Sequence, residues 1–108
     1  MSEGIPQVAP NDLKKEIEGG ANIFLLDVRE ASEFKIVALP RAYHVPLGEL
    51  RHRYEDLEAD DDIVVYCHRG VRGAQAVTFL RAKGFTRVRN LAGGIDHWAE
   101  TVEPITRY

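Results

Sequence analysis

The sequence has few of the features that mark secreted, membrane-embedded or nucleic-acid-binding proteins. Among its 108 residues there is one cysteine, Cys67, so an internal disulfide is excluded and we expect a reducing compartment, the cytoplasm. No apolar run is long enough to span a bilayer, and the opening residues lack the basic start and apolar stretch of an export signal. The formal net charge is -3, from 14 basic and 17 acidic residues, so neither nucleic acid nor an anionic membrane is an expected partner.

What the sequence does contain is typical of a compact globular domain. Hydrophobic residues make up 44% and charged residues 29%, which argues against wholesale disorder. A chain of 108 residues can bury a core without a disulfide or a structural metal, and it is short for two domains. We therefore expect a single domain over residues 1–108.

Strand-like and helical patterns alternate along the chain, which indicates an α/β fold with a mostly parallel central sheet and helices on both faces. In such folds, binding and catalytic sites gather beyond the carboxyl ends of the strands. Pro10 suits the first turn of a helix that ends at Gly19 and Gly20. The remaining patterns predict strands over 23–26, 43–45, 63–66 and 88–91, helices over 31–36, 47–54, 71–83 and 95–99, and a turn at 93–94.

The lone cysteine lies where chemistry is expected in such a fold. Cys67 follows the apolar run 63–66 and precedes a loop, 68–72, that leads into a helical pattern. A strand here would deliver the sulfur to the carboxyl edge of the sheet, where loop N–H groups and a helix start favour a thiolate over a thiol. Cys67 is therefore a candidate nucleophile. The alternative is a buried structural cysteine, because cysteine also packs as a small hydrophobe.

The loop after Cys67 has residues suited to surrounding an anionic sulfur. Gly70 relieves the strain of a tight turn, and Arg69 and Arg72 add positive charge that could hold the oxyanion of a sulfur donor. His68 could contribute its backbone N–H without using its imidazole. With Val71, these residues make up the predicted active loop.

Two alternatives stay open for the loop arginines. Arg69 could be a charge that faces solvent, with no part in binding. Arg72, at the start of a predicted helix, could pair with a carboxylate such as Asp27 or Glu33 instead of a donor. The sequence alone does not decide between these roles.

Four blocks of the sequence together resemble the rhodaneses, a family of sulfurtransferases. The resemblance covers nearly the whole chain, and its most specific part is the loop 67–72, which begins with cysteine and ends with arginine. The matching blocks are Asp27-Val28-Arg29-Glu30 with Glu33-Phe34, Leu39-Pro40 with Ala42 and Val45-Pro46-Leu47, Cys67-His68-Arg69-Gly70-Val71-Arg72, and Asn90-Leu91-Ala92-Gly93-Gly94-Ile95 with Trp98.

The resemblance implies a rhodanese-like fold and a sulfurtransferase without a cofactor. Rhodaneses carry sulfur as a cysteine persulfide, taken typically from thiosulfate and passed to cyanide, a thiol or a sulfur-carrier protein. By position, Cys67 would form the persulfide, residues 68–72 would cradle it, and Asp27 and Arg29 would support the site. From Cys67 to its last residue the chain is also similar to the rhodanese domain fused to enzymes that adenylylate sulfur-carrier proteins.

One block departs from the family pattern. Rhodaneses commonly show a Gly-His pair, an aliphatic residue, Pro and Gly where this chain has Val37-Ala38-Leu39-Pro40-Arg41. Two glycines and a histidine are therefore replaced. The nucleophile and its loop are unaffected, so the change bears on the packing beside the site and on the choice of donor.

The sequence also leaves alternatives to sulfur transfer. Cell-cycle-type phosphatases and arsenate reductases place five residues between cysteine and arginine, whereas four separate Cys67 from Arg72. A non-catalytic rhodanese-like interaction or sensing module is a further alternative, although its usual mark is a lost cysteine. A thiol-disulfide oxidoreductase would need a resolving cysteine. We expect no metal site, because His44, His52 and His97 lack partners at ligand spacing.

Overall fold

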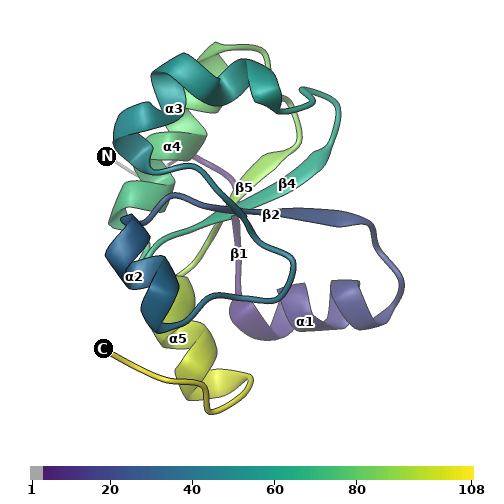
Figure 1. Ribbon diagram of the computed structural model, residues 1–108. Helices are drawn as coiled ribbons and strands as arrows, with labels where there is room; N and C mark the ends of the chain where they lie inside the picture. Colours follow the sequence, from purple (N-terminus) through teal and green to yellow (C-terminus); the bar gives the residue numbers. More distant parts are fainter. Residues whose placement is uncertain (1–3) are drawn as a thin grey trace.

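A computed structural model of the chain describes residues 4–108 and contains one sheet of five strands, in the order β1-β5-β4-β2-β3. All four strand pairings are parallel, which confirms the predicted parallel sheet (Figure 1). β4 lies at the centre of the sheet because it carries apolar side chains on both of its faces. The strands are β1 (Gln7–Val8), β2 (Ile23–Asp27), β3 (Tyr43–His44), β4 (Asp62–Tyr66) and β5 (Val88–Leu91).

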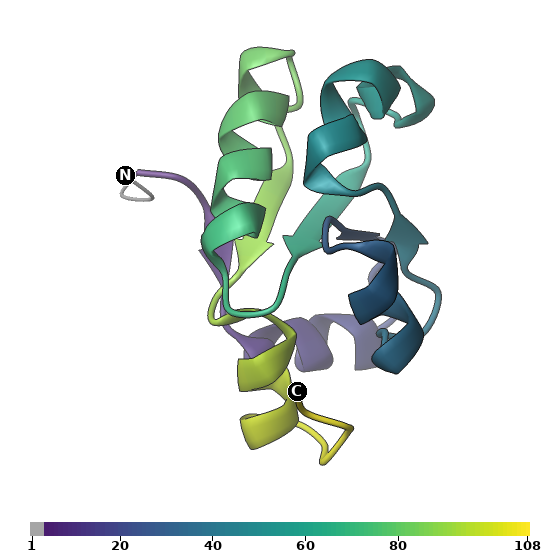
Figure 2. The same cartoon turned by 60° about the vertical axis from the view of Figure 1, so that its left-hand side comes forward.

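Helices cover both faces of the sheet, as the sequence predicts (Figure 2). No helix among residues 4–108 has the length and apolar character needed to cross a bilayer. The helices are α1 (Pro10–Glu18), α2 (Ala31–Ile36), α3 (Leu47–Arg53), α4 (Val71–Ala82) and α5 (Gly94–Thr101), with a 3-10 turn at Tyr54–Asp56.

Alternate residues of β4 join two separate apolar clusters. Ile63 and Val65 pack on the face covered by α3 and α4, in the same cluster as Cys67. Val64 and Tyr66 pack on the opposite face, where α1 and α5 lie. Because side chains alternate along a strand, this pattern points the Cys67 side chain toward α4. The sulfur therefore lies under the amino end of that helix.

The carboxyl ends of β2 and β4 meet at one edge of the sheet. Asp27, the last residue of β2, is in register with Tyr66, the last residue of β4, so Cys67 follows directly beyond it. α2 and α4 both begin at this edge, after short loops. The edge is the place where α/β folds carry their sites.

The structure corrects several details of the sequence reading. The short strand β1 and the 3-10 turn at Tyr54–Asp56 were not predicted, because two or three residues give too little periodic signal. Gly94 is the first residue of α5 rather than part of the turn, and the helix continues to Thr101 instead of ending at residue 99. The predicted strand 43–45 ends at His44, and the helices predicted to end at 54 and 83 end one residue earlier.

Arg41 occupies a backbone conformation that favours glycine. Its φ angle is +65°, and it is the one non-glycine residue with positive φ in residues 4–108. The N–H of Ala42 donates to the Leu39 carbonyl at 3.2 Å, which closes a four-residue turn with Pro40 and Arg41 in its centre. Proline followed by a positive φ is typical of a type II turn, whose third position is usually glycine. Arg41 stands where the rhodanese pattern has that glycine, so the departure leaves a strained residue.

Arg41→Gly should stabilise the fold. Removing the Cβ relieves the strain of the left-handed backbone conformation. This gain should exceed the entropic cost of a more flexible unfolded chain, so the free energy of unfolding should rise by roughly 0.5–1 kcal/mol. Urea unfolding followed by circular dichroism measures the free energy of unfolding. Arg41→Ala is the matched control, because it removes the same guanidinium but keeps the Cβ. If the alanine variant gained as much stability as the glycine variant, backbone strain would not be the cause.

Candidate active site

The Cys67 sulfur is enclosed by the loop that follows it. Cys67 is 1% exposed, and its Sγ accepts backbone N–H groups from Gly70 at 3.1 Å and Gly73 at 3.2 Å. Within residues 4–108, none of the other loop residues donates a backbone N–H to this sulfur. The cradle predicted for residues 68–72 therefore extends one residue further, to Gly73, and the N–H of His68 takes no part in it.

The helix start explains why these two N–H groups point at the sulfur. Gly70 precedes α4 with a φ angle of +109°, a conformation in which a side chain would be strained. Because glycine has no side chain to cap the helix, the first-turn N–H groups are left for another acceptor. Cys67 Sγ fills that role at the positive end of the α4 dipole, and both effects favour negative charge on the sulfur.

Neighbouring elements hold the loop in shape. The Cys67 and His68 carbonyls accept backbone N–H groups from the first turn of α5, at 2.9 Å and 3.0 Å. A Cβ at Gly94 would collide with these two carbonyls, so only glycine fits at the start of α5. The buried Asn90 side chain donates to the Gly70 carbonyl at 3.1 Å, which ties the loop to β5. Gly94 thus serves a close approach of two backbones.

Arg72 is paired with Glu33. Its two terminal nitrogens donate to the two carboxylate oxygens of Glu33 at 2.6 Å and 3.0 Å. The bond from Arg72 is the main cause that lowers the pKa of Glu33 to about 2 from an ordinary value of 4.5, and the same pair raises the pKa of Arg72. The sequence left two roles open for Arg72, binding a donor or pairing with a carboxylate. In the structure Arg72 pairs with a carboxylate, and the partner is Glu33 rather than Asp27.

Arg69 extends from the other side of the loop. Its side chain is 69% exposed, and the nearest carboxylate, Asp96, lies 4.0 Å from its Nε. Asp96 is itself held by Arg107 at 2.9 Å and 3.0 Å, and those bonds lower the pKa of Asp96. Arg69 is thus largely a solvent-facing cation in this structure, and it remains free to meet an incoming anion.

Asp27 and Arg29 form a buried ion pair beneath the loop. Both side chains are fully buried, and Arg29 donates to the Asp27 carboxylate from Nε and Nη2, at distances of 2.7 Å to 3.1 Å. Further bonds from Arg29 reach the carbonyls of Glu33 and Val37. These contacts place the pair between β2 and the segment around α2. The pair contacts the surroundings of the site and not the sulfur itself, which fits a supporting position.

The carboxyl-terminal Tyr108 bridges these groups. Its hydroxyl accepts a hydrogen bond from Arg29 at 2.8 Å and donates one to Glu33 at 2.8 Å. Its ring stacks on the His68 ring, with centroids 3.9 Å apart and planes 10° from parallel. Burial is the main cause that raises the pKa of Tyr108 to about 12, so the hydroxyl stays protonated and able to donate. One residue therefore links the loop, the Glu33–Arg72 pair and the buried Asp27–Arg29 pair.

Comparison with known families supports the same assignment of the fold. The profile described as Rhodanese-like domain matches residues 9–101. The chain belongs to the rhodanese family. The matched range includes every element from α1 to α5 and the whole loop after Cys67. The family resemblance drawn from the sequence is thereby confirmed.

Several relatives match over most of this rhodanese domain. It is 31% identical over 101 residues to a sulfurtransferase of Allochromatium vinosum, covering 94% of each chain. It is 33% identical over 105 residues to an adenylyltransferase and sulfurtransferase of Zea mays, covering 91% of this chain but 22% of the maize protein. A relative from Bacillus subtilis, 30% identical over 102 residues, is also longer, and the chain spans 55% of it.

A solved structure has the same fold. The rhodanese-related protein from Thermoplasma volcanium superposes with a TM-score of 0.84 at 31% sequence identity, covering 95% of this chain and 99% of that one. The correspondence over nearly the full length of both chains means that the sheet order and the placement of the loop are those of a rhodanese domain.

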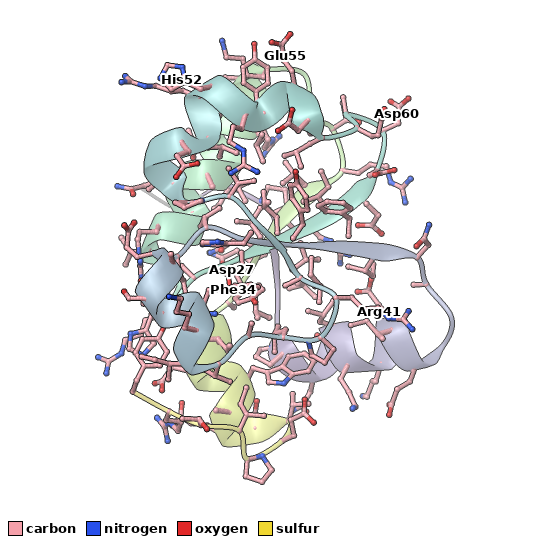
Figure 3. All side chains as sticks on the ribbon, viewed as in Figure 1. Asp27, Phe34, Arg41, His52, Glu55 and Asp60 are labelled. Atoms are coloured by element: carbon pink, nitrogen blue, oxygen red, sulfur yellow. The ribbon has the colours of Figure 1, made fainter. Side chains whose placement is uncertain are left out.

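The other histidines lie apart from the sulfur. His44 lies within 2.6 Å of the Arg29 carbonyl and stacks on Phe34, and His97 lies 3.4 Å from Glu100. His52 is exposed on α3, away from Asp27 (Figure 3). Across the described chain, residues 4–108, no group of three or more His, Cys, Asp or Glu side chains is placed to hold a metal ion.

A cavity of about 620 Å³ borders the outer side of the loop. Gly70 and Val71 line it next to the exposed guanidinium of Arg69. Polar side chains from β1, α4 and β5 complete the wall, among them Gln7, Gln75 and Asn90. The rhodanese domain thus presents a mixed polar and apolar hollow beside the loop that follows Cys67.

Three residues of the site were not predicted as part of it. Gly73 could have been found, because a helix that starts at Val71 places the N–H of its third residue over the sulfur. Glu33 was considered only as a partner of Arg72. Tyr108 gives no local signal, because it meets Arg29 across 79 positions of sequence. Trp98 packs in the core at 4% exposure.

Glu33→Gln should change how stability depends on pH. The folded-state pKa of Glu33 is depressed to about 2, so its pair with Arg72 stabilises the fold above pH 4.5 and is lost as the pH falls toward 2. The variant should be less stable above pH 4.5, by on the order of 2 kcal/mol after allowance for solvent screening. Its stability should then fall less steeply on acidification, as measured by urea unfolding at several pH values.

Glu58→Gln is the matched control, because Glu58 is exposed and forms none of the ion pairs found in residues 4–108. It should follow the wild-type curve. Parallel curves for wild type and the Glu33 variant across the acid range would contradict the assigned ion pair.

Proposed function

We propose that this rhodanese domain is a sulfurtransferase that carries sulfane sulfur as a persulfide on Cys67. The observation that supports this most directly is the pair of N–H groups, from Gly70 and Gly73, that meet at one buried sulfur at a helix start. Such a cradle favours an anionic sulfur before reaction and an anionic outer sulfur after it. The sulfurtransferase relative from Allochromatium vinosum, matched over 94% of both chains, supports the reaction class.

The proposed reaction has two steps, each of which balances. The Cys67 thiolate attacks the outer sulfur of thiosulfate, a new S–S bond forms, and the bond to the sulfonate sulfur breaks with its electron pair leaving as sulfite. A nucleophilic acceptor then takes the outer sulfur and restores the thiolate. Cyanide would leave as thiocyanate, and a thiol as a persulfide. No cofactor enters either step.

The loop residues have distinct parts in this proposal. Arg69 is the exposed cation that first meets an anionic donor, because its side chain is 69% exposed and its carboxylate neighbour, Asp96, is 4.0 Å away. Arg72 directly precedes Gly73, whose N–H meets the sulfur, but its guanidinium shares its charge with Glu33. His68 and Val71 shape the loop, and the Asp27–Arg29 pair supports it from below without touching the sulfur.

The acceptor is proposed at the level of its chemistry. A thiol or a sulfur-carrier protein would serve in the cell, and cyanide would serve in an assay. The Bacillus subtilis relative, whose name refers to a sulfur carrier protein, supports a protein acceptor. The cavity beside Arg69 and Val71 gives an acceptor room next to the loop.

Sulfur loading tests the proposal. After exposure to thiosulfate, wild type should gain one sulfur atom by intact mass and should transfer sulfur to cyanide, because Cys67 is the single thiol of the chain. Cys67→Ala should do neither and should fall to the background rate.

Cys67→Ser is a matched control, because its hydroxyl keeps a hydrogen-bond acceptor for the loop but cannot form a persulfide. It should stay folded by circular dichroism and stay inactive. Equal turnover of wild type and Cys67→Ala would remove Cys67 from the reaction.

A further inference from the structure

Glu33 is a permanent anion at the edge of the active loop. It accepts both terminal nitrogens of Arg72, the Tyr108 hydroxyl and the backbone N–H of Glu30. Arg72 is the main cause of the low pKa of Glu33, about 2, so the carboxylate remains charged at every pH at which the protein would work. The Glu33–Arg72 pair therefore carries no net charge beside the sulfur.

The remaining charges near the loop also alternate in sign. The Asp27–Arg29 pair is neutral as a unit. Arg69 lies 4.0 Å from Asp96, which is bound by Arg107, and Arg107 lies 3.8 Å from Glu100. The positive field at the sulfur is consequently weaker than two unpaired arginines in the loop would produce. Glu33 cancels the charge of Arg72.

We propose that Glu33 sets the donor preference of Cys67 by charge, favouring monoanionic sulfane-sulfur donors over the dianion thiosulfate. Because Glu33 cancels the charge of Arg72, a second negative charge on a donor gains no net attraction from this pair. This inference rests on the proposed function and names a selectivity residue for the same site.

Tyr108 is the positioning residue for this carboxylate. Its hydroxyl donates to Glu33 Oε2 while it accepts from Arg29, which is anchored on the buried Asp27. The carboxylate is thus tied to the interior of the protein and is not free to swing away when an anion arrives. Selectivity by charge needs a fixed charge, and this chain of bonds supplies it.

Two small donors that react in the same way but differ in net charge allow the effect of charge to be measured alone. Thiosulfate carries two negative charges, and methanethiosulfonate carries one, with a methyl group in place of an oxygen. In both, Cys67 sulfur bonds the outer sulfur, the S–S bond of the donor breaks, and the electron pair leaves on sulfite or on methanesulfinate. Their ratio of second-order loading rates on Cys67 is the quantity that Glu33 should control.

Glu33→Gln should shift that ratio toward thiosulfate. Glutamine keeps the size of the side chain and an oxygen for Arg72, but it removes the negative charge. Removing one negative charge from this edge of the loop favours a dianion more than a monoanion, so the relative rate with thiosulfate should rise by about tenfold. Loading is followed by intact mass, so the readout does not depend on an acceptor. Glu33→Ala, which removes the pair entirely, should shift the ratio in the same direction.

Glu16→Gln is the matched control. Glu16 also binds an arginine through both oxygens, Arg89 at 2.9 Å and 2.9 Å, but that pair adjoins Asp62 at the start of β4, at the opposite edge of the sheet from Cys67. If the donor ratio responded to the loss of any surface charge or ion pair, both glutamine variants would change it alike. The control should therefore keep the wild-type donor ratio.

The outcomes distinguish the selectivity from the reaction. A tenfold shift in the Glu33 variants with an unchanged Glu16 variant supports the inference. If the wild type loads both donors and the Glu33 variants keep the wild-type ratio, the proposed selectivity is wrong, although sulfur transfer by Cys67 still holds. Wild type that loads neither donor would overturn the proposed function itself, and the selectivity with it.

Discussion

The arrangement of this site depends on two backbone hydrogen bonds to one sulfur. Gly70 and Gly73 aim their N–H groups at Cys67 Sγ at 3.1 Å and 3.2 Å, and every other feature near the loop either permits that geometry or responds to it. Gly70 accepts the positive φ that turns the chain into α4. Gly94 lets α5 approach closely enough to bind the loop carbonyls. Backbone donors cost nothing to orient once the fold has formed, which makes them suited to holding an anion.

Charge around the sulfur is balanced rather than accumulated. The cations near the loop have carboxylate partners, and the connections run from buried Asp27 through Arg29 and Tyr108 to Glu33 and Arg72. If Cys67 carries sulfur as proposed, moderate stabilisation of the anionic outer sulfur suits both its gain and its release, because a strongly positive site would hold the persulfide too tightly. The helix start provides the local attraction, and the ion pairs limit the field beyond it.

Local patterns predicted the parts of the fold that are local. The apolar run 63–66, the loop and the following helix appear where the sequence places them, because strand burial and helix capping act over a few residues. Contacts between distant segments could not be predicted. Nothing near Tyr108 indicates that it reaches Arg29, and the two-residue strand β1 forms only because β5 lies beside it. For Arg72 the sequence left two roles open, and tertiary packing decided in favour of Glu33.

Amide proton shifts test the central claim most directly. In a two-dimensional nitrogen–proton spectrum, replacing Cys67 by alanine removes the acceptor, so the Gly70 and Gly73 amide protons should move upfield more than the others. Gly84, which has a similar positive φ at the far end of α4, should keep its position. Movement of the two loop glycines with Gly84 unchanged is the result that this account predicts. Unmoved Gly70 and Gly73 resonances would show that the sulfur is not held by these bonds.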